Sequence, residues 1–131
     1  MTLVLVDDDD LVAALGNAQP GDRVLLEPGN YAGGLYVQDL SGVTISSTDP
    51  RNRAIISGGL NNIQLVRAQN LTISHLIFQN ASANGINIDD GGPDSETRAE
   101  GVVLERVVVR DCGKGGNHDG IKLSGLLGFE V

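Results

Sequence analysis

The sequence predicts an all-β protein, a parallel β-helix of about four coils, from three observations. One segment occurs twice, because residues 70–88 have a second copy in residues 101–123. Apolar residues in both copies alternate with polar ones, as in strands, and do not recur at helical spacing. A repeat of about 30 residues is typical of a solenoid, in which each repeat buries its apolar face against the next. The matched apolar positions are Leu71 and Val102, Leu76 and Val107, and Ile86 and Ile121.

The last strand of each copy predicts which side chains face outward. Successive side chains of a strand point to opposite faces, so the isoleucines and leucine at positions 86, 88, 121 and 123 are expected to point inward. If the copies stack in register, Asn87 lies beside Lys122 and Asp89 beside Ser124 on the outer face. Any function of this sheet then belongs to these four outward residues.

Residues 1–131 are expected to form one domain, with an N-terminal strand and a capping helix in residues 1–20 and the coils in residues 21–131. Four aspartates at positions 7–10 precede an apolar helical face formed by Leu11, Val12, Leu15 and Ala18. Carboxylates are favoured at the start of a helix. We therefore predict a short helix from about Asp9 to Asn17 that covers the first coil. A metal site at the aspartates is the alternative to a solvated helix start.

The composition excludes some partners and leaves the localisation open. A formal charge of −8, from 17 acidic and 9 basic residues, argues against a nucleic-acid partner. No stretch reaches the ~18 apolar residues of a membrane span, so no membrane contact is expected. Residues 1–6 are too short and lack the basic flank of a secretory signal, so a secreted or periplasmic protein is expected only if a leader has been removed. The single cysteine, Cys112, excludes an internal disulfide.

The run from Gln19 to Tyr31, QPGDRVLLEPGNY, follows the expected strand and helix. In this order the chain resembles the opening of the pectate-lyase-like right-handed β-helix proteins, and it is most similar to the alginate lyase and chondroitinase B group of polysaccharide lyases. The resemblance extends through the coils and corresponds to the N-terminal part of those proteins. It implies a right-handed β-helix and a lyase that cleaves uronate-containing polysaccharide by β-elimination.

Residues 117–122 read NHDGIK and resemble the NTDGID strand of polygalacturonase-type glycoside hydrolases. This resemblance implies that Asp119 is a catalytic acid. Lys122, however, replaces the second acidic residue of that motif, and inverting hydrolysis needs two carboxylates. A structural role is the alternative, because Asn84-Gly85 occupies the position of Asp119-Gly120 one coil earlier and such pairs favour turns. A hydrolase is therefore a second alternative function.

Lys122 is the candidate base of a lyase. In the lyases that the chain resembles, a metal ion or basic side chain neutralises the uronate carboxylate while a lysine or arginine abstracts the adjacent proton. Asn87, Asn117 and His118 are candidate substrate-binding residues, although neighbours in a strand point opposite ways and cannot all face one substrate. The many nearby carboxylates oppose the deprotonation that a lysine base requires.

Asp89, Asp90 and Asp94 are candidate metal ligands. They lie at the end of a predicted strand and in the glycine-containing loop that follows it. Carboxylate oxygens on a flexible loop are ligands that Ca²⁺ prefers, so calcium is the expected metal. A solvated acidic loop without a metal ion is the alternative. The binding of an acidic polysaccharide would then require basic side chains to neutralise its carboxylates.

The last residues predict an incomplete coil. Phe129 and Val131 stand where Val102 and Leu104 stood in the preceding coil, so the core and strand edge are expected to be open at this end. Either a longer protein or an end-to-end homo-oligomer would cover them. Two classes of function remain: a module of a polysaccharide lyase, and a non-catalytic β-helix that binds or assembles through its open C-terminal end.

Overall fold

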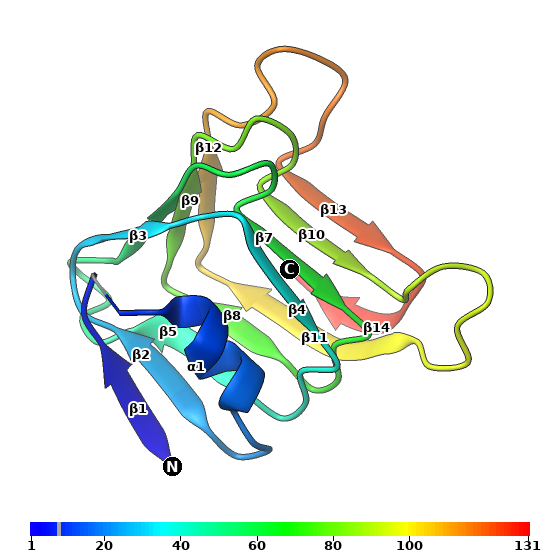
Figure 1. Ribbon diagram of the computed structural model, residues 1–131, viewed down its shortest axis with the longest axis horizontal. Helices are drawn as coiled ribbons and strands as arrows, with labels where there is room; N and C mark the ends of the chain where they lie inside the picture. The colour runs from blue at the N-terminus through cyan, green and yellow to red at the C-terminus, as the bar shows by residue number, and fades with distance from the viewer. Residues whose placement is uncertain (8) are drawn as a thin grey trace.

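Short β-branched segments separated by glycine, asparagine and aspartate form strands that pair only with their equivalents in the neighbouring repeats. The computed structural model describes residues 1–7 and 9–131, and in these residues the strands form three parallel sheets with one helix, α1 (Figure 1). The strands of the first sheet, in spatial order, are β1 (Thr2–Leu5), β2 (Arg23–Leu26), β5 (Thr44–Ser47), β8 (Thr72–Ser74), β11 (Ala99–Glu105) and β14 (Leu126–Glu130).

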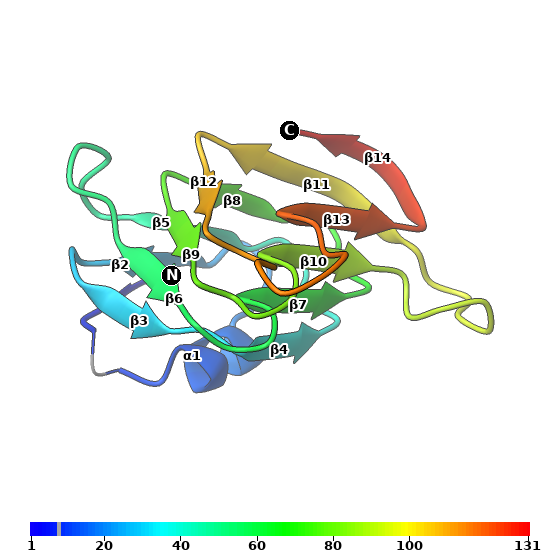
Figure 2. The same ribbon diagram turned by 90° about the horizontal axis from the view of Figure 1, so that it is seen from above.

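The other two sheets have four strands each. The second sheet contains β3 (Asn30–Ala32), β6 (Ile55–Ser57), β9 (Ile77–Gln79) and β12 (Val108–Arg110). The third contains β4 (Leu35–Gln38), β7 (Ile63–Val66), β10 (Ile86–Asp89) and β13 (Ile121–Ser124). Seen from above, the strands lie in layers, with α1 at one end of the stack and β14 at the other (Figure 2).

The register of the strands reproduces the repeat in the sequence. Thr72 pairs with Val103, Ile77 with Val108, and Ile86 with Ile121. These pairs have the separations that the two sequence copies predicted. The chain is mostly strands in parallel sheets stacked repeat upon repeat, which confirms the architecture expected of a parallel β-helix.

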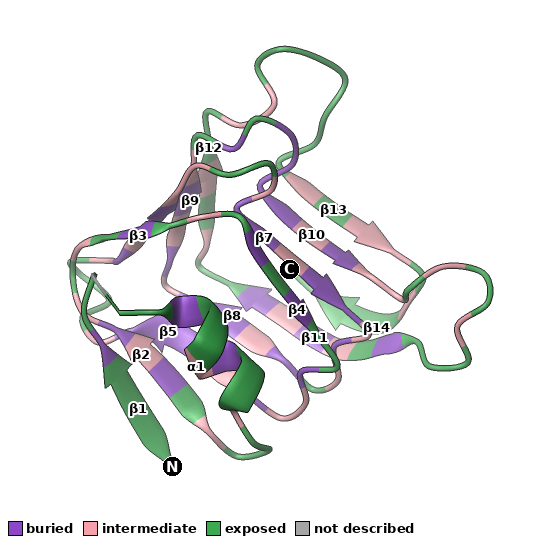
Figure 3. Ribbon diagram, viewed as in Figure 1, coloured by how far each residue is buried: buried purple, intermediate pink, exposed green. Residues whose placement is uncertain are grey.

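The core is the space that the three sheets enclose (Figure 3). In the second sheet Tyr31, Ile56 and Phe78 pair in one inward row, and each is at most 2% exposed. Burial of one such side chain contributes roughly 1.5–3 kcal/mol, so the inward rows dominate the stability of the fold. The equivalent residue of β12, Val109, is only partly buried.

The helix α1 (Leu11–Asn17) is shorter than predicted because Asp10 caps it. Asp10 has an extended backbone, and its Oδ1 accepts a hydrogen bond from the backbone N–H of Ala13 at 3.0 Å. Leu11 and Leu15 are buried in the core, whereas Val12 is 43% exposed, so its predicted place on the buried face is wrong. Of the acidic run at positions 7–10, Asp8 lies outside the described residues.

With seven residues, α1 is too short to cross a bilayer, and the described part of the chain has no other helix.

In two successive repeats, the chain turns from the first sheet to the second at a single residue with a left-handed backbone. His75 has φ 53° and Arg106 has φ 50°, and both lie between short strands. Each of these residues therefore forms a bend between two sheets. The bend at His75 directs the chain from β8 in the first sheet to β9 in the second. The bend at Arg106 does the same for β11 and β12.

Tyr31 joins three segments at the α1 end of the core. Its buried hydroxyl lies 2.9 Å from the carbonyl oxygen of Leu5 and 2.8 Å from that of Glu27. Burial raises the pKa of Tyr31 to about 12, and the negative charges of Asp7, Glu27 and Asp9 act in the same direction. The neutral phenol is therefore the form that the folded state favours.

We predict that Tyr31→Phe changes how stability depends on pH. In the unfolded chain a tyrosine ionises near pH 10, whereas Tyr31 in the folded protein stays protonated to about pH 12. The folded state then holds more protons, so the contribution of Tyr31 is complete below about pH 10 and is lost as the pH rises to about 12. Urea unfolding of the native chain and of Tyr31→Phe between about pH 10 and pH 12 should show that the difference between their free energies of unfolding decreases as the pH rises. Parallel pH profiles would contradict this assignment.

Candidate functional site

The outer face of the third sheet carries an aligned row of polar side chains. Tyr36 pairs with Gln64, Gln64 with Asn87, and Asn87 with Lys122, so one residue from each of β4, β7, β10 and β13 contributes. We name these four residues the outer row. The predicted pairing of Asn87 with Lys122 and of Asp89 with Ser124 is confirmed.

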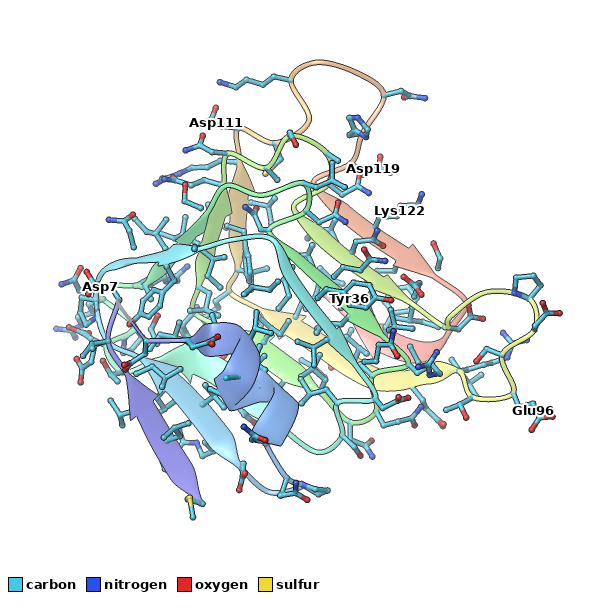
Figure 4. The ribbon with its side chains drawn as sticks, in the orientation of Figure 1. Asp7, Tyr36, Glu96, Asp111, Asp119 and Lys122 are labelled. Carbon is cyan, nitrogen blue, oxygen red and sulfur yellow. The ribbon has the colours of Figure 1, made fainter. Side chains whose placement is uncertain are left out.

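Two long loops flank this sheet. The loop from β10 to β11 follows its carboxyl edge, and the loop from β12 to β13 precedes β13 (Figure 1). Tyr36, Asp119 and Lys122 lie over the sheet or at its edge, whereas Glu96 lies far out on the first loop (Figure 4). The outer row is thus bordered by two loops, the β10–β11 connection and the β12–β13 connection.

Hydrogen bonds hold the middle of the outer face in place. The Nδ2 of Asn61 donates to Oε1 of Gln64 at 3.2 Å, and Nε2 of Gln64 donates to Oδ2 of Asp89 at 3.2 Å. The other carboxylate oxygen of Asp89 accepts a hydrogen bond from the backbone N–H of Gly91 at 2.9 Å. Both oxygens of Asp89 are therefore occupied by neighbours within the chain.

A second hydrogen-bonded group orients Tyr36, and the sequence analysis missed it. Arg67 binds Asp39 through Nε at 2.7 Å and Nη2 at 3.2 Å, and Nη2 also donates to Oε1 of Gln38 at 3.0 Å. The Nε2 of Gln38 in turn donates to the hydroxyl of Tyr36 at 3.0 Å. The hydrogen bond from Arg67 holds the pKa of Asp39 below its usual value. Asp39 and Arg67 directly follow equivalent strands, so their opposite charges were a readable signal.

A shallow hollow lies at the Tyr36 end of the outer row. Its volume is about 170 Å³, and Gly34, Leu35, Tyr36, Leu60, Asn61 and Gln64 line it. Tyr36 is 50% exposed and Leu60 is also exposed, so apolar surface meets two side-chain amides here. An apolar wall with a few convergent polar groups is the usual composition of a small-ligand site.

Lys122 lies exposed at the opposite end of the outer row. Its ammonium group forms no ion pair within the described residues, whose ion pairs are Met1 with Asp22, Arg67 with Asp39, and Lys114 with Asp111. It is therefore available to an anion from solution. A lysine that acts as a general base is commonly buried, because burial favours its neutral form. Lys122 is not buried in this way.

The three predicted residues that precede β13 are all exposed. The backbone N–H of Asp119 donates to Oδ1 of Asn84 at 2.8 Å, and its carbonyl oxygen accepts from the N–H of Gly85 at 3.2 Å. The backbone of Asp119 thus has the predicted structural role, stacked on the equivalent turn. His118 packs against Gly113 within the loop, and Asn117 and His118 precede the strand without joining the outer row.

The candidate calcium ligands do not form a cluster. Asp90 lies against Gly125, and its Oδ1 accepts a hydrogen bond from the N–H of Gly92 at 3.1 Å. Asp94 is exposed in the loop that follows. Among residues 1–7 and 9–131, no three carboxylate, imidazole or thiol groups come together as a metal site. Calcium binding by Asp89, Asp90 and Asp94 stays a prediction.

We predict that Asn84→Ala destabilises the fold by about 1–3 kcal/mol, because the N–H of Asp119 loses its buried acceptor. Urea unfolding measures this loss, and the amide of Asp119 should exchange with solvent faster. Asn117→Ala is the matched control, since Asn117 is exposed in the loop that contains Asp119. Its effect on the free energy of unfolding should stay within about 0.5 kcal/mol. Equal effects of the two substitutions would show that the Asn84 side chain does not anchor the turn.

No family model matches the chain, and no curated protein sequence matches it. Among solved structures, the alginate lyase from Paenibacillus sp. str. FPU-7 is similar to it, with a TM-score of 0.58 and 22% sequence identity. The similarity covers 85% of this chain and 39% of the lyase, so the chain spans about two-fifths of that protein's length. The predicted resemblance to the alginate lyase group is confirmed at the level of structure. In fold, the chain is similar to a polysaccharide lyase.

Proposed function

We propose that the chain is a right-handed β-helix module of about four coils that binds uronate-containing polysaccharide along the outer row. The observation that carries this proposal is the register that places Tyr36, Gln64, Asn87 and Lys122 side by side on one face. Neighbouring strands are about 4.8 Å apart, so the row extends over about 14 Å along the stack. That length suits several linked sugars and exceeds what one small ligand would need.

Each end of the row suits a different part of such a polymer. At one end the Tyr36 ring and Leu60 offer apolar surface to the C–H groups of a sugar, and Asn61 and Gln64 offer amides to its hydroxyls. At the other end the ammonium group of Lys122 supplies a positive charge for a uronate carboxylate. The amide of Asn87 lies between these ends and can donate and accept hydrogen bonds.

The carboxylates of this face repel an acidic polymer less than their number suggests. Arg67 neutralises Asp39 through two hydrogen bonds, and Gln64 and Gly91 occupy the oxygens of Asp89. Lys122 has no such partner among the described residues. The ammonium group of Lys122 would therefore be free to form an ion pair with a uronate carboxylate.

A lyase reaction at this site would use Lys122 as its base. In this role Lys122 would react as the neutral amine and not as the ammonium group that binds a carboxylate. The amine takes the proton from the sugar carbon next to the carboxylate, a carbon–carbon double bond forms, and the bond to the 4-linked oxygen breaks. The leaving oxygen then takes a proton from solvent. The similarity in fold to an alginate lyase supports this chemistry over the hydrolase alternative, which depends on Asp119 alone.

Lys122→Ala tests the proposal, with Lys114→Ala as the matched control because the chain has only these two lysines, both exposed. Uronate oligosaccharides should bind Lys122→Ala roughly tenfold more weakly than the native chain, and Lys114→Ala about as well as the native chain. Lys122→Arg should keep binding because it keeps the positive charge. Lys122→Ala should lose any unsaturated product that the native chain forms, which is followed by its ultraviolet absorbance. Unchanged binding by Lys122→Ala would refute the site. Binding without product would leave a sugar-binding module.

A non-catalytic assembly module is the second candidate, and one observation favours it. The strands β12, β13 and β14 form the edge of the stack, where Leu127 is 56% and Phe129 58% exposed. Ile121 and Leu123, next to them, are only partly buried. An open edge of this kind can pair with further strands, including those of a second copy. Sedimentation of the sugar-free chain, run beside the binding assay, would show such self-association.

A further inference from the structure

The second sheet has an outer face unlike the rest of the molecule. None of its four strands contains an acidic residue, although the chain has 17 acidic and 9 basic residues. The strands β6, β9 and β12 are stacked in successive layers (Figure 2). Ile55 pairs with Ile77, and Ile77 with Val108, so an apolar row crosses the outer face of these strands. The neighbouring row on the same face ends in Arg110, whose Nε donates to Oε1 of Gln79 at 2.9 Å.

Two arginines meet at the other side of the apolar row. The Nη1 of Arg53 donates to the carbonyl oxygen of Arg106 at 2.9 Å, so the guanidinium of Arg53 lies at the residue from which the Arg106 side chain starts. Arg106 is an exposed left-handed bend residue that directly follows β11, and Val107 separates it from β12. Arg110 is the last residue of β12 and Arg106 precedes the strand at the bend, so the two arginines lie on either side of Val108 along the chain.

These guanidinium groups have no carboxylate partner in the part of the chain that the structure describes. Within residues 1–7 and 9–131 no carboxylate lies within 4.0 Å of Arg53, Arg106 or Arg110. Glu105 and Asp111 are their neighbours in sequence, and Asp111 pairs with Lys114 at 3.4 Å instead. Arg23, Arg51 and Arg98 also have no ion pair among the described residues. What distinguishes Arg53, Arg106 and Arg110 is their place at the borders of an apolar row on a sheet whose strands contain no acidic residue.

We propose that this face is a second binding surface for acidic polysaccharide, separate from the outer row of the third sheet. Arg53 and Arg106 bind one carboxylate of the polymer, Arg110 binds another, and Ile77 and Val108 contact the sugar ring between them. Guanidinium groups bind carboxylates by strong, charge-assisted hydrogen bonds. The surface holds the polymer while the outer row acts on another part of it. The ligand class rests on the proposed function, whereas the surface rests on the apolar row and the arginines at its borders.

A polymer suits this surface better than a second copy of the chain. Each copy carries a net charge of −8, so two copies repel each other over most of their surfaces. A uronate polymer presents carboxylates at regular intervals with C–H faces between them, which matches cationic groups on both sides of an apolar row. Its binding should weaken with salt, because the arginines are exposed and screened.

The test compares two double variants of the full chain in native gels that contain alginate or, as the neutral control, dextran. Arg106→Gln with Arg110→Gln removes two charges from this face, and Arg23→Gln with Arg98→Gln removes two exposed charges elsewhere. The first variant should bind alginate roughly tenfold more weakly, and the second should bind about as well as the native chain. Neither should change migration in dextran. Circular dichroism confirms folding, and alginate oligosaccharides should shift the Val108 and Arg110 amide signals of the native chain.

Equal alginate binding by the two double variants, or no shift at Val108 and Arg110, would overturn the proposal. Salt-sensitive self-association without alginate, lost in the first variant, would overturn it in favour of a second copy as the partner. The Lys122→Ala variant separates this surface from the outer row. If only Lys122→Ala weakens binding, the second surface fails and the proposed function stands. If only the arginine variant does, the outer row fails and the second surface stands.

Discussion

Parallel pairing of each strand with its equivalent in the next repeat is the constraint on which the rest of the structure depends. Because the side chains of a strand alternate, a fixed register places apolar residues in inward rows and polar residues in outward rows at the same time. The row of Tyr31, Ile56 and Phe78 and the row of Tyr36, Gln64, Asn87 and Lys122 arise from this one pairing rule. A shift of one residue would turn both rows over, so the core protects the geometry of the surface.

The same rule explains how a small acidic chain carries surfaces of different character. In the third sheet, opposite charges at equivalent positions, Asp39 and Arg67, neutralise each other within the stack. In the second sheet, one outer row is apolar, and the arginines at its borders have no ion pair among the described residues. The net charge of the chain therefore does not predict what each face binds. Residues at the same position of successive repeats lie on the same face, so each face has its own charge.

Much of the fold could be predicted from the sequence, because the repeat fixes which residues pair. The pairing of Ile86 with Ile121 and of Asn87 with Lys122 follows from the spacing of the two copies. Contacts between side chains of different repeats could not be predicted in this way. The network that links Arg67, Gln38 and Tyr36 depends on side-chain directions that spacing does not give. The exposure of Val12 similarly depends on how α1 docks, which its periodicity leaves open.

The central claim is that the outer row holds a uronate polysaccharide, and a crystal structure of the chain with a uronate oligosaccharide tests it most directly. The account predicts sugar density that crosses β4, β7, β10 and β13, with a carboxylate at the ammonium group of Lys122 and a ring beside Tyr36. An oligosaccharide found only on other faces, or a carboxylate directed away from Lys122, would contradict it.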